Sequence, residues 1–481
     1  MRRDLVAGID SSTQSCTVML RRLEDGAVVT EARASHPTTT PPRSEQSPLA
    51  WWTALLNAFT DLKPYLSRIA AISVGGQGHG LVLLGEDDKP LRDAKLWNDT
   101  EAAPDAVQLV RNLGAQTWAE RTGSVPAAAL TIAKLAWTER VHPGLVRRAR
   151  RVMLPSDYLI YRLSGKAVTE RGVASGTGYF NPFTDTWDYE LADLAVSGID
   201  WAAVLPAIIG SSDAAGAVGK DCCLDDLEGA VVGAGSGDNM TAALGMGIRE
   251  GDVVISLGTS GTIYGTTQSP VRDGSGSING YADAAGAFMP MVTTLNAAKV
   301  TDAFRRILGV GVDEFDRLAL ACPAGANGVA LVPYLDGERT PNLPGATGFL
   351  TGLRSDVTPG QIARAAVEGV ICGLLEGGDL LRAQGLRTNG RLIVTGGASR
   401  SKIYRQVLAD LTGEPVWTCT LLESAAGGAA VQAAAALTGT PASRIAEAWA
   451  PTFEVVAEPN SEAWARAEDV RNTYQKARAR A

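Results

Sequence analysis

The stretch that decides the fold covers residues 231–262 and reads VVGAGSGDNMTAALGMGIREGDVVISLGTSGT. Its glycine-rich loop at 233–237 lets the backbone adopt conformations that other residues resist and brings a ligand close to the main chain. Asp238 and Asn239 stand at the exit of this loop, and the segment 240–247 is predicted to be helical. Asp238 is therefore a candidate for chemistry. It is equally a candidate N-cap, because Asp before an Ala-rich run is a common helix start.

A small polar turn between two apolar, strand-like runs occurs twice in the chain. The first turn follows the run 5–9 and the second follows the run 253–255. Their candidate residues are Asp10, Ser11, Ser12 and Thr13 in the first turn and Gly258, Thr259 and Ser260 in the second. Such turns present N–H groups and hydroxyls that suit phosphate oxygens, and an aspartate beside them suits a hydrated Mg²⁺. Either turn alone is explained as well by a hairpin, but two copies about half a chain apart indicate two related halves.

A third glycine turn lies at 391–400, where the sequence reads RLIVTGGASR. The apolar residues 392–394 predict a buried strand. Gly396 and Gly397, followed by Ala398, would let a flat ring such as adenine approach the backbone. Further on, the segment 424–435 is rich in alanine and glycine, which predicts a helix that packs closely against its neighbours.

The order of these features resembles the actin, Hsp70 and sugar kinase superfamily and, within it, the FGGY carbohydrate kinase family. The segment GFLTGL at 348–353, followed after seven residues by QIARAAVE at 361–368, is similar to the C-terminal signature of that family. The N-terminal signature is only partly present, as Thr131, Lys134, Leu135 and Trp137. The resemblance covers nearly the whole chain.

This resemblance implies an α/β fold of two ribonuclease-H-like domains of the actin/hexokinase type, each a mixed sheet flanked by helices, with ATP in the interdomain cleft. The domains are expected at 1–246 and 247–481. By the same resemblance, Asp238 is the base that accepts the hydroxyl proton, and Asp10 holds Mg²⁺ through waters. The two polar turns would hold the phosphates, while Gly396, Gly397 and Ala398 would face adenosine.

A candidate sugar-binding turn, GGQGHG at 75–80, follows the strand predicted at 69–74. The glycines leave Gln77 and His79 projecting as hydrogen-bonding groups, which suits a polyhydroxylated ligand. A tight turn with a surface histidine explains the local sequence equally well. Within the family the turn resembles the sugar site of xylulokinases, where Gly78 is usually Met.

The segment LWNDTE at 96–101 also resembles a family motif, in which an Arg usually stands where this chain has Glu101. Trp97, Asn98 and Asp99 are candidate sugar ligands, because a Trp face stacks on a sugar ring while polar groups meet its hydroxyls. Plain packing of the tryptophan is the alternative. Asp238 and Asn239 complete the set of candidate sugar ligands.

The function implied by the resemblance is ATP-dependent phosphorylation of a sugar hydroxyl, D-xylulose to D-xylulose 5-phosphate. Glycerol, ribulose or gluconate are the alternative substrates of such a family member. A different class would be an actin-like nucleotide switch or a sugar sensor without catalysis. Gln77, His79 and Asp238 favour the enzyme, because a bare nucleotide switch needs none of them.

Composition fits an enzyme of two large domains, since 481 residues allow each domain its own core. A formal net charge of −8 gives no footprint for nucleic acid, and no apolar run approaches the length of a membrane span. Six cysteines without C-x-x-C spacing predict free thiols in a reducing compartment, and hence a cytoplasmic protein. Three histidines exclude a histidine-rich metal site. The expected partners are a sugar and ATP, and a homodimer is left open.

Overall fold

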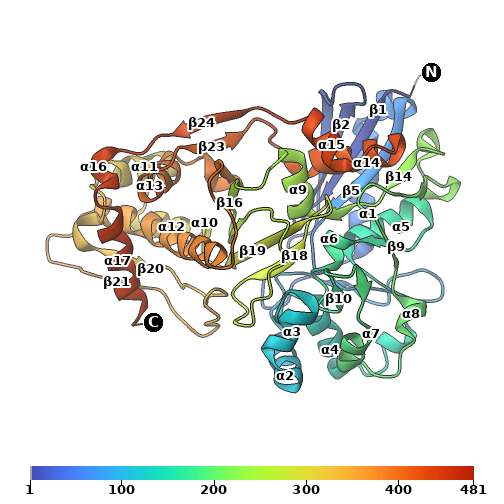
Figure 1. Cartoon of the computed structure of the whole chain (residues 1–481), viewed down its shortest axis with the longest axis horizontal. Helices are drawn as coiled ribbons and strands as arrows, with labels where there is room; N and C mark the ends of the chain where they lie inside the picture. Colours follow the sequence, from blue (N-terminus) through green and yellow to red (C-terminus); the bar gives the residue numbers. More distant parts are fainter. Residues whose placement is uncertain (1–2, 481) are drawn as a thin grey trace.

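The structure, a computed structural model, describes residues 3–480 and contains two mixed β-sheets with helices around them (Figure 1). The strands and α-helices up to residue 246 are β1 Leu5–Ser11, β2 Ser15–Arg22, β3 Val28–Ser35, β4 Glu45–Gln46, α1 Pro48–Asp61, β5 Ile69–Gly76, β6 Val82–Leu84, β7 Ala94–Lys95, α2 Ala103–Leu113, α3 Ala115–Thr122, α4 Thr131–Val141, β8 Arg151–Met153, α5 Pro155–Ser164, β9 Val168–Glu170, α6 Arg171–Ala174, β10 Phe180–Asn181, β11 Thr186–Trp187, α7 Tyr189–Ala195, α8 Trp201–Val204, β12 Ala207–Ile209, β13 Ala214–Ala217, β14 Val231–Gly233, β15 Ser236–Gly237 and α9 Asp238–Met246.

The second half of the chain adds a comparable set. It comprises β16 Val253–Leu257, β17 Gly261–Tyr264, β18 Asn279–Ala282, β19 Phe288–Thr294, α10 Ala298–Leu308, α11 Val312–Ala321, β20 Ala330–Val332, β21 Phe349–Thr351, α12 Pro359–Ala383, β22 Leu392–Thr395, α13 Lys402–Thr412, β23 Val416–Cys419, α14 Ser424–Thr438, α15 Ala442–Ala448, β24 Phe453–Ala457, α16 Ser461–Trp464 and α17 Ala467–Arg478.

The two large sheets share one strand order. In the first sheet β3, β2, β1, β5 and β14 lie side by side, with β1, β2 and β3 antiparallel and with β5 and β14 parallel to β1. In the second sheet β19, β17, β16, β22 and β23 repeat this order and these directions. The prediction of two related halves of the ribonuclease-H type is therefore confirmed.

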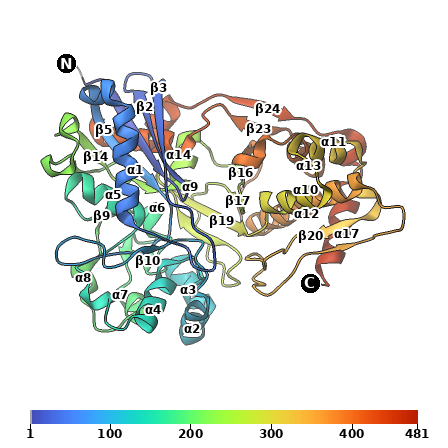
Figure 2. The ribbon, with the colours of Figure 1, turned by 180° about the vertical axis from the view of Figure 1, so that it is seen from behind.

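The two faces of β1 bury different partners, as the alternation of side chains along a strand requires. Leu5, Ala7 and Ile9 pack into a core that includes Trp51 and Phe59 of α1, and Figure 2 shows α1 and α5 covering this side of the sheet. The side chains between them face α14 instead, where Val6 belongs to a separate core. Asp10 alternates with Ile9, so its side chain lies on the α14 side.

Helices α9 and α14 cross between the two sheets, although α14 belongs to the C-terminal part of the chain. Figure 1 shows α14 in red beside the blue strands β1 and β2. A Cβ on Gly428 of α14 would lie 1.8 Å from the carbonyl oxygen of Thr241 in α9, and one on Gly245 would lie 2.1 Å from that of Ser424. Only glycine permits this approach, which confirms the close packing predicted for 424–435.

Helix α12 begins as the sequence indicates. Thr358 is the N-cap, its hydroxyl accepts from the N–H of Gln361, and the Gln361 side chain accepts from the N–H of Thr358 in return. Pro359 occupies the first helical position, where its missing N–H costs nothing. This reciprocal capping fixes the start of a helix that spans 25 residues.

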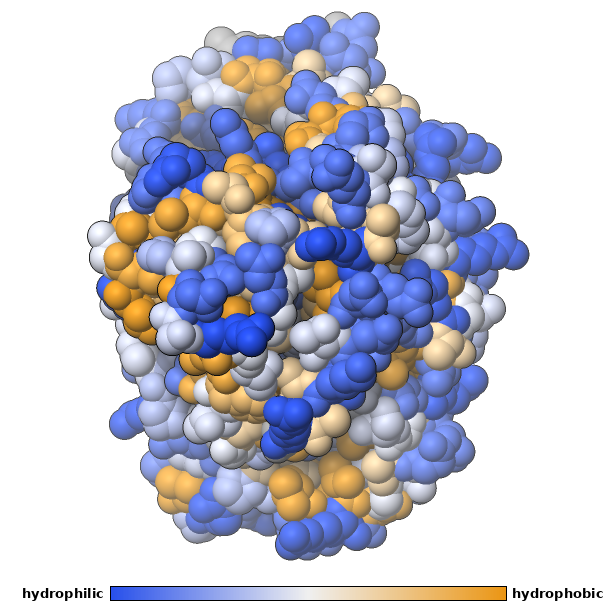
Figure 3. Space-filling model, turned by 90° about the vertical axis from the view of Figure 1, so that its left-hand side faces the viewer, coloured by the Kyte–Doolittle hydropathy of each residue, from blue (hydrophilic) through white to orange (hydrophobic). Residues whose placement is uncertain are grey.

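The surface at the end of the C-terminal half is mainly hydrophilic, with separate apolar areas among charged groups (Figure 3). Within residues 3–480, no helix is both long enough and apolar enough to cross a membrane. All six cysteines are free, as predicted.

Candidate active site

The register of the first sheet brings the two candidate aspartates to one edge. Asp10 pairs with Gly75 of β5, and Gly75 pairs on its other side with Ser236 of β15. Asp238 follows β15 directly and opens α9. The carboxyl ends of parallel strands meet at the same edge of a sheet, so residues far apart in the sequence become neighbours here.

The carboxyl group of Asp10 has an oxygen that a bound cation could coordinate. Its Oδ1 is buried and has no hydrogen-bond partner among the described residues. Burial raises the pKa of Asp10 well above its usual range, and the nearby carboxylates of Asp238 and then Glu423 raise it further, against a smaller lowering effect of Arg33. A carboxylate oxygen without a partner among the described residues, with two further carboxylates near enough to raise its pKa, fits a bound cation.

Asp238 is the first residue of α9, and Gly237 is the N-cap. The alternative interpretation of Asp238 as the cap is therefore wrong for this structure. Its Oδ1 accepts from the backbone N–H of Asn239 at 2.7 Å and from the Asn239 side chain at 3.0 Å. Burial raises its pKa to about 6, partly offset by these two hydrogen bonds. Among residues 3–480, no hydrogen bond reaches its Oδ2, which leaves that oxygen available to a ligand.

The second polar turn and the Gly396 turn lie side by side at the ends of β16 and β22. Ser256 pairs with Thr395, and a Cβ on Gly396 would lie 2.7 Å from the carbonyl oxygen of Leu257. The carbonyl of Gly258 accepts from the N–H of Ala298, at the start of α10. Gly396 and Gly397 are exposed, and a Cβ on Gly397 would meet nothing within 4 Å. Backbone at this place is therefore open to a flat ligand.

The first turn is held by its own hairpin, in which the N–H and the hydroxyl of Ser12 both donate to the carbonyl of Ser15. The hydroxyl of Ser11 is buried and has no partner within the described part of the chain, and the same holds for the hydroxyl of Thr262 at the second turn. Thr13 accepts a hydrogen bond of 2.9 Å from the indole N–H of Trp97. The hairpin thus brings a candidate phosphate turn and a candidate sugar residue into direct contact.

Gln77 and His79 are not surface turn residues. Gln77 is fully buried, its N–H donates to the carbonyl of Ser11, and its Oε1 has no partner among the described residues. His79 is part-buried and adopts φ 65°, and a Cβ on Gly78 between them would meet nothing within 4 Å. The space that a methionine would occupy in this turn is therefore open.

The hydrogen bond of His79 to Gly176 fixes its tautomer. Nδ1 lies 2.9 Å from the carbonyl oxygen of Gly176, which can only accept, so Nδ1 carries the proton. Burial lowers the pKa of His79 to about 3, and the positive charges of Lys134 and Arg339 lower it as well. The neutral ring therefore offers the lone pair of Nε2, which lies 3.4 Å from the hydroxyl of Tyr281.

Asp99 belongs to a buried ion cluster. Its Oδ2 accepts from Lys95 Nζ at 2.8 Å and from the N–H of Ser44, and the same ammonium contacts Glu45 at 3.2 Å and Glu101 at 2.6 Å. The three carboxylates have metal-like spacing, but the lysine already satisfies them. The Oδ1 of neighbouring Asn98 is buried and has no partner among the described residues. Asn98 can therefore bind a ligand, whereas Asp99 is already paired with Lys95.

Three residues at the sugar turn went unassigned by sequence reasoning. Tyr281 of β18 stacks beside His79 with ring centroids 5.6 Å apart. Lys134 of α4 is buried, and burial lowers its pKa to about 7. Arg339 interacts with Tyr281, and its positive charge helps to lower the pKa of His79. Lys134 was noticed only as part of a signature. No local pattern assigns Tyr281 or Arg339 to the sugar turn, because the second half of the chain brings them there.

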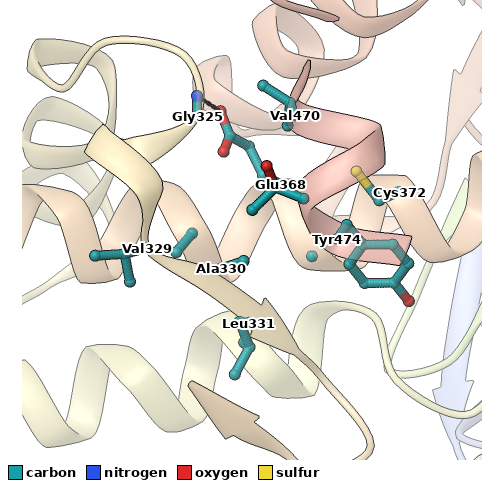
Figure 4. A pocket seen from close by; sticks show the side chains of 11 residues that line it. Gly325, Val329, Ala330, Leu331, Glu368, Cys372, Val470 and Tyr474 are labelled. Carbon is teal, nitrogen blue, oxygen red and sulfur yellow. Dashed lines mark hydrogen bonds between the residues drawn. The ribbon is translucent and has the colours of Figure 1, made fainter. Parts of the chain in front are cut away.

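The C-terminal signature on α12 lies away from this edge. Glu368 is buried and accepts from the N–H of Gly325, as Figure 4 shows. It also accepts from Arg364. The cavity beside it measures about 10 Å³ and includes Cys372 and Tyr474 in its lining, which is room for one water at most. In this chain Glu368 of the signature anchors the turn at Gly325.

An actin/hexokinase-type fold with polar turns and a glycine loop at the ends of its strands is typical of proteins that bind nucleotide phosphates. Comparison with known proteins agrees. The model of the FGGY family of carbohydrate kinases matches residues 5–245 with its N-terminal domain and residues 253–437 with its C-terminal domain. The chain belongs to this FGGY family of carbohydrate kinases.

Individual relatives cover almost the whole chain. The xylulose kinase of Streptomyces rubiginosus is 41% identical over 466 residues, which are 97% of this chain and 94% of the relative. The crystal structure of xylulose kinase from Bifidobacterium adolescentis superposes with a TM-score of 0.85 at 35% identity and covers 99% of both chains. That of gluconate kinase from Lactobacillus acidophilus gives 0.89 at 26% identity, covering 99% of this chain and 97% of the other.

Proposed function

We propose that this carbohydrate kinase transfers the terminal phosphoryl group of ATP to O5 of D-xylulose, giving D-xylulose 5-phosphate. The relatives named xylulose kinase support this substrate. Gluconate is the second candidate, because a gluconate kinase shares the fold at similar coverage and because Gly78 departs from the usual xylulokinase turn.

The observation that carries the proposal is a set of buried polar atoms that lack partners within residues 3–480. They flank the predicted site and comprise Asp10 Oδ1, Ser11 Oγ, Gln77 Oε1, Asn98 Oδ1 and Thr262 Oγ1. A buried polar group without a partner costs about 1–3 kcal/mol. A sugar, a polyphosphate and a cation would together supply partners for all five.

Asp238 is the proposed general base. Its free Oδ2 accepts the proton of the attacking sugar hydroxyl while the oxygen of that hydroxyl approaches the terminal phosphorus. Phosphoryl transfer passes through a loose transition state, so most of the catalysis is positioning and neutralisation of charge. The N–H of Asn239 and its side chain both hold Asp238 Oδ1, which orients the carboxylate for this step.

Mg²⁺ fits the residues at Asp10, because a buried carboxylate oxygen without a partner beside two further acidic groups is an oxygen-rich site. The residue that would hold it, through waters, is Asp10. When bound, the ion would neutralise charge on the phosphates of ATP. The hydroxyls of Ser11, Ser12, Thr13, Thr259 and Ser260 would bind phosphate oxygens, and the open backbone at 396–398 would face adenosine.

His79 and Gln77 are proposed to select the sugar. The lone pair of His79 Nε2 can accept a hydrogen bond from a sugar hydroxyl that replaces the long 3.4 Å bond from the Tyr281 hydroxyl, and the Oε1 of Gln77 can accept another. Trp97, already tied to Thr13, offers a ring face for the carbon skeleton.

A panel of sugars tests the proposal. ADP release is measured with D-xylulose, D-ribulose, gluconate and glycerol at matched concentrations, with Mg²⁺ and ATP saturating. We expect the highest kcat/KM with D-xylulose. A preference for gluconate or glycerol would move the substrate assignment to that compound, and ATP turnover that no polyol stimulates would contradict a sugar kinase function.

A further inference from the structure

The segment 169–177 lies between the Asp238 loop and the His79 turn, and the carboxyl group of Glu170 connects it to the Asp238 loop. Glu170 is fully buried at the end of β9 and has no role in the mechanism described above. Its Oε1 accepts from the hydroxyl of Ser211 at 2.5 Å. Its Oε2 accepts from the hydroxyl of Ser236 at 2.6 Å and from the N–H of Gly172 at 2.8 Å.

Two of these partners lead directly to residues of the proposed mechanism. Ser236 belongs to β15, immediately before Gly237 and Asp238, and pairs with Gly75. Gly172 belongs to α6, for which Glu170 is the N-cap, and the chain beyond α6 reaches Gly176, whose carbonyl holds His79 Nδ1. The third partner, Ser211, is linked to the Asp238 loop through its backbone, because Gln432 of α14 donates both to the Ser211 carbonyl and to the carbonyl of Gly235. The Ser211 hydroxyl takes no part in these two bonds, so Ser211→Ala leaves both carbonyl acceptors in place.

We propose that Glu170 is a positioning residue that fixes the Asp238 loop and the His79 turn relative to each other. This inference rests on the proposed function of Asp238 as the base and His79 as a sugar ligand. Three donors converge on the two oxygens of a fully buried carboxyl group, at 2.5, 2.6 and 2.8 Å. A displacement of about 1 Å at a reacting group can cost about 10² in rate, so an anchor at this place controls turnover without touching substrate.

The two serines form a matched pair for the test. Ser236→Ala removes the hydroxyl that ties Glu170 to the Asp238 loop, and Ser211→Ala removes an equivalent hydroxyl on the other oxygen. We expect Ser236→Ala to lower kcat by about 10- to 100-fold with little change in the KM for D-xylulose or ATP. Ser211→Ala should leave kcat within about twofold of the parent, even if both variants lose similar thermal stability.

Two substitutions of Glu170 itself form the second matched pair of variants. Gln can keep its amide oxygen at the position shared by Ser236 and Gly172 and donate its NH₂ to the Ser211 hydroxyl, which can accept. Glu170→Gln should therefore keep most of the activity. Glu170→Ala loses both connections and should lower kcat and raise the sugar KM together.

Equal kcat in Ser236→Ala and Ser211→Ala, or a Glu170→Gln variant as impaired as Glu170→Ala, would overturn the inference. Asp238→Asn, measured in parallel, keeps the two hypotheses apart. If Asp238→Asn is inactive while Ser236→Ala equals the parent, the positioning role fails and the proposed function stands. If Asp238→Asn is fully active, the proposed function fails as well.

Discussion

The carboxyl groups of Asp10 and Asp238 lie at one sheet edge, and each has an oxygen that the protein does not satisfy. Burial raises the pKa of both, to about 6 for Asp238. A base with a pKa close to the working pH combines the correct ionisation state with an adequate driving force for proton transfer. The position that makes Asp238 costly to ionise therefore also makes it suited to the chemistry.

The pH dependence of turnover follows from this value. The ionised form of Asp238 is the active base, so kcat should be constant at high pH and should fall about tenfold per unit once the pH drops well below about 6. The measurement is kcat at saturating sugar and MgATP across pH 5 to 8, with stability checked at each pH. A profile that stays flat down to pH 5 would contradict Asp238 as the base.

His79 should act as a neutral hydrogen-bond acceptor. Its pKa of about 3 lies below the assay range, so its ionisation should not change the sugar KM between about pH 5.5 and 8. His79→Ala should weaken sugar binding by about 1 to 3 kcal/mol and leave the ATP KM unchanged. His142→Ala, at an exposed histidine, is the control. An unchanged sugar KM in His79→Ala would remove His79 from the site.

Unfolding has its own pH dependence through the same ring. Because the folded pKa lies below the ordinary value of 6.5, the unfolded chain binds a proton that folded His79 does not. The contribution of His79 to stability is therefore complete above about pH 6.5 and declines as the pH falls toward 3.

The proposed role of Asp10 in holding Mg²⁺ can be tested by a Mg²⁺ titration of a variant. Asp10→Asn should reduce turnover by about 10² and shift the Mg²⁺ titration to higher concentration, because a carboxylate facing the cation is lost. Asp61→Asn, at an exposed carboxylate, serves as the control. Lost stability with normal kinetics and a normal Mg²⁺ curve would make Asp10 a structural residue.

The sequence identified the residues that carry their own local pattern. Asp10, Gln77 and Gly396 follow apolar runs, and the structure puts each at the end of a strand. Asp238 stands at the exit of the glycine-rich loop, and the structure puts it at the start of α9. Tyr281, Arg339 and Glu170 have no such pattern, because strand pairing and the approach of the second half determine what they contact. Sequence reasoning also could not show that Lys95 forms a buried ion pair with Asp99.

At the scale of elements, boundaries were predictable where capping chemistry sets them. Thr358, Pro359 and Gln361 mark the start of α12, and the structure confirms it. The partner of α14 was not predictable in this way. Its small residues indicate that something packs closely, but only the fold shows that α9 crosses it.

The crossing of α9 and α14 gives a stability prediction. Gly428→Ala would force a methyl group to within 1.8 Å of the Thr241 carbonyl oxygen, and backbone cannot move aside as a flexible side chain can. We expect a loss of about 3 kcal/mol or more in the free energy of unfolding, measured by denaturant titration. Gly345→Ala, where a Cβ meets nothing within 4 Å, should stay close to the parent. Equal stability of the two variants would contradict the close approach.

For the whole molecule, the repeated strand order explains why two weak turn motifs half a chain apart form one site. The hairpin after β1 and the loop after β5 lie at one edge of the first sheet, and the hairpin after β16 and the loop after β22 lie at the corresponding edge of the second. Helices α9 and α14 join the halves through a common core. A domain boundary at 246/247 stays a prediction, and α14 packs on the sheet of the first half whichever division is used.

The central claim is that the carboxylate of Asp238 accepts the proton of the sugar hydroxyl as the phosphoryl group moves. The most direct measurement is the rate of D-xylulose phosphorylation by Asp238→Asn under saturating MgATP and sugar, with the affinities for both substrates measured on the same preparation. Asn has the size of Asp but cannot accept the proton. The account predicts a folded variant with near-parental affinities and a rate lower by about 10² to 10⁴. A rate close to that of the parent would contradict it.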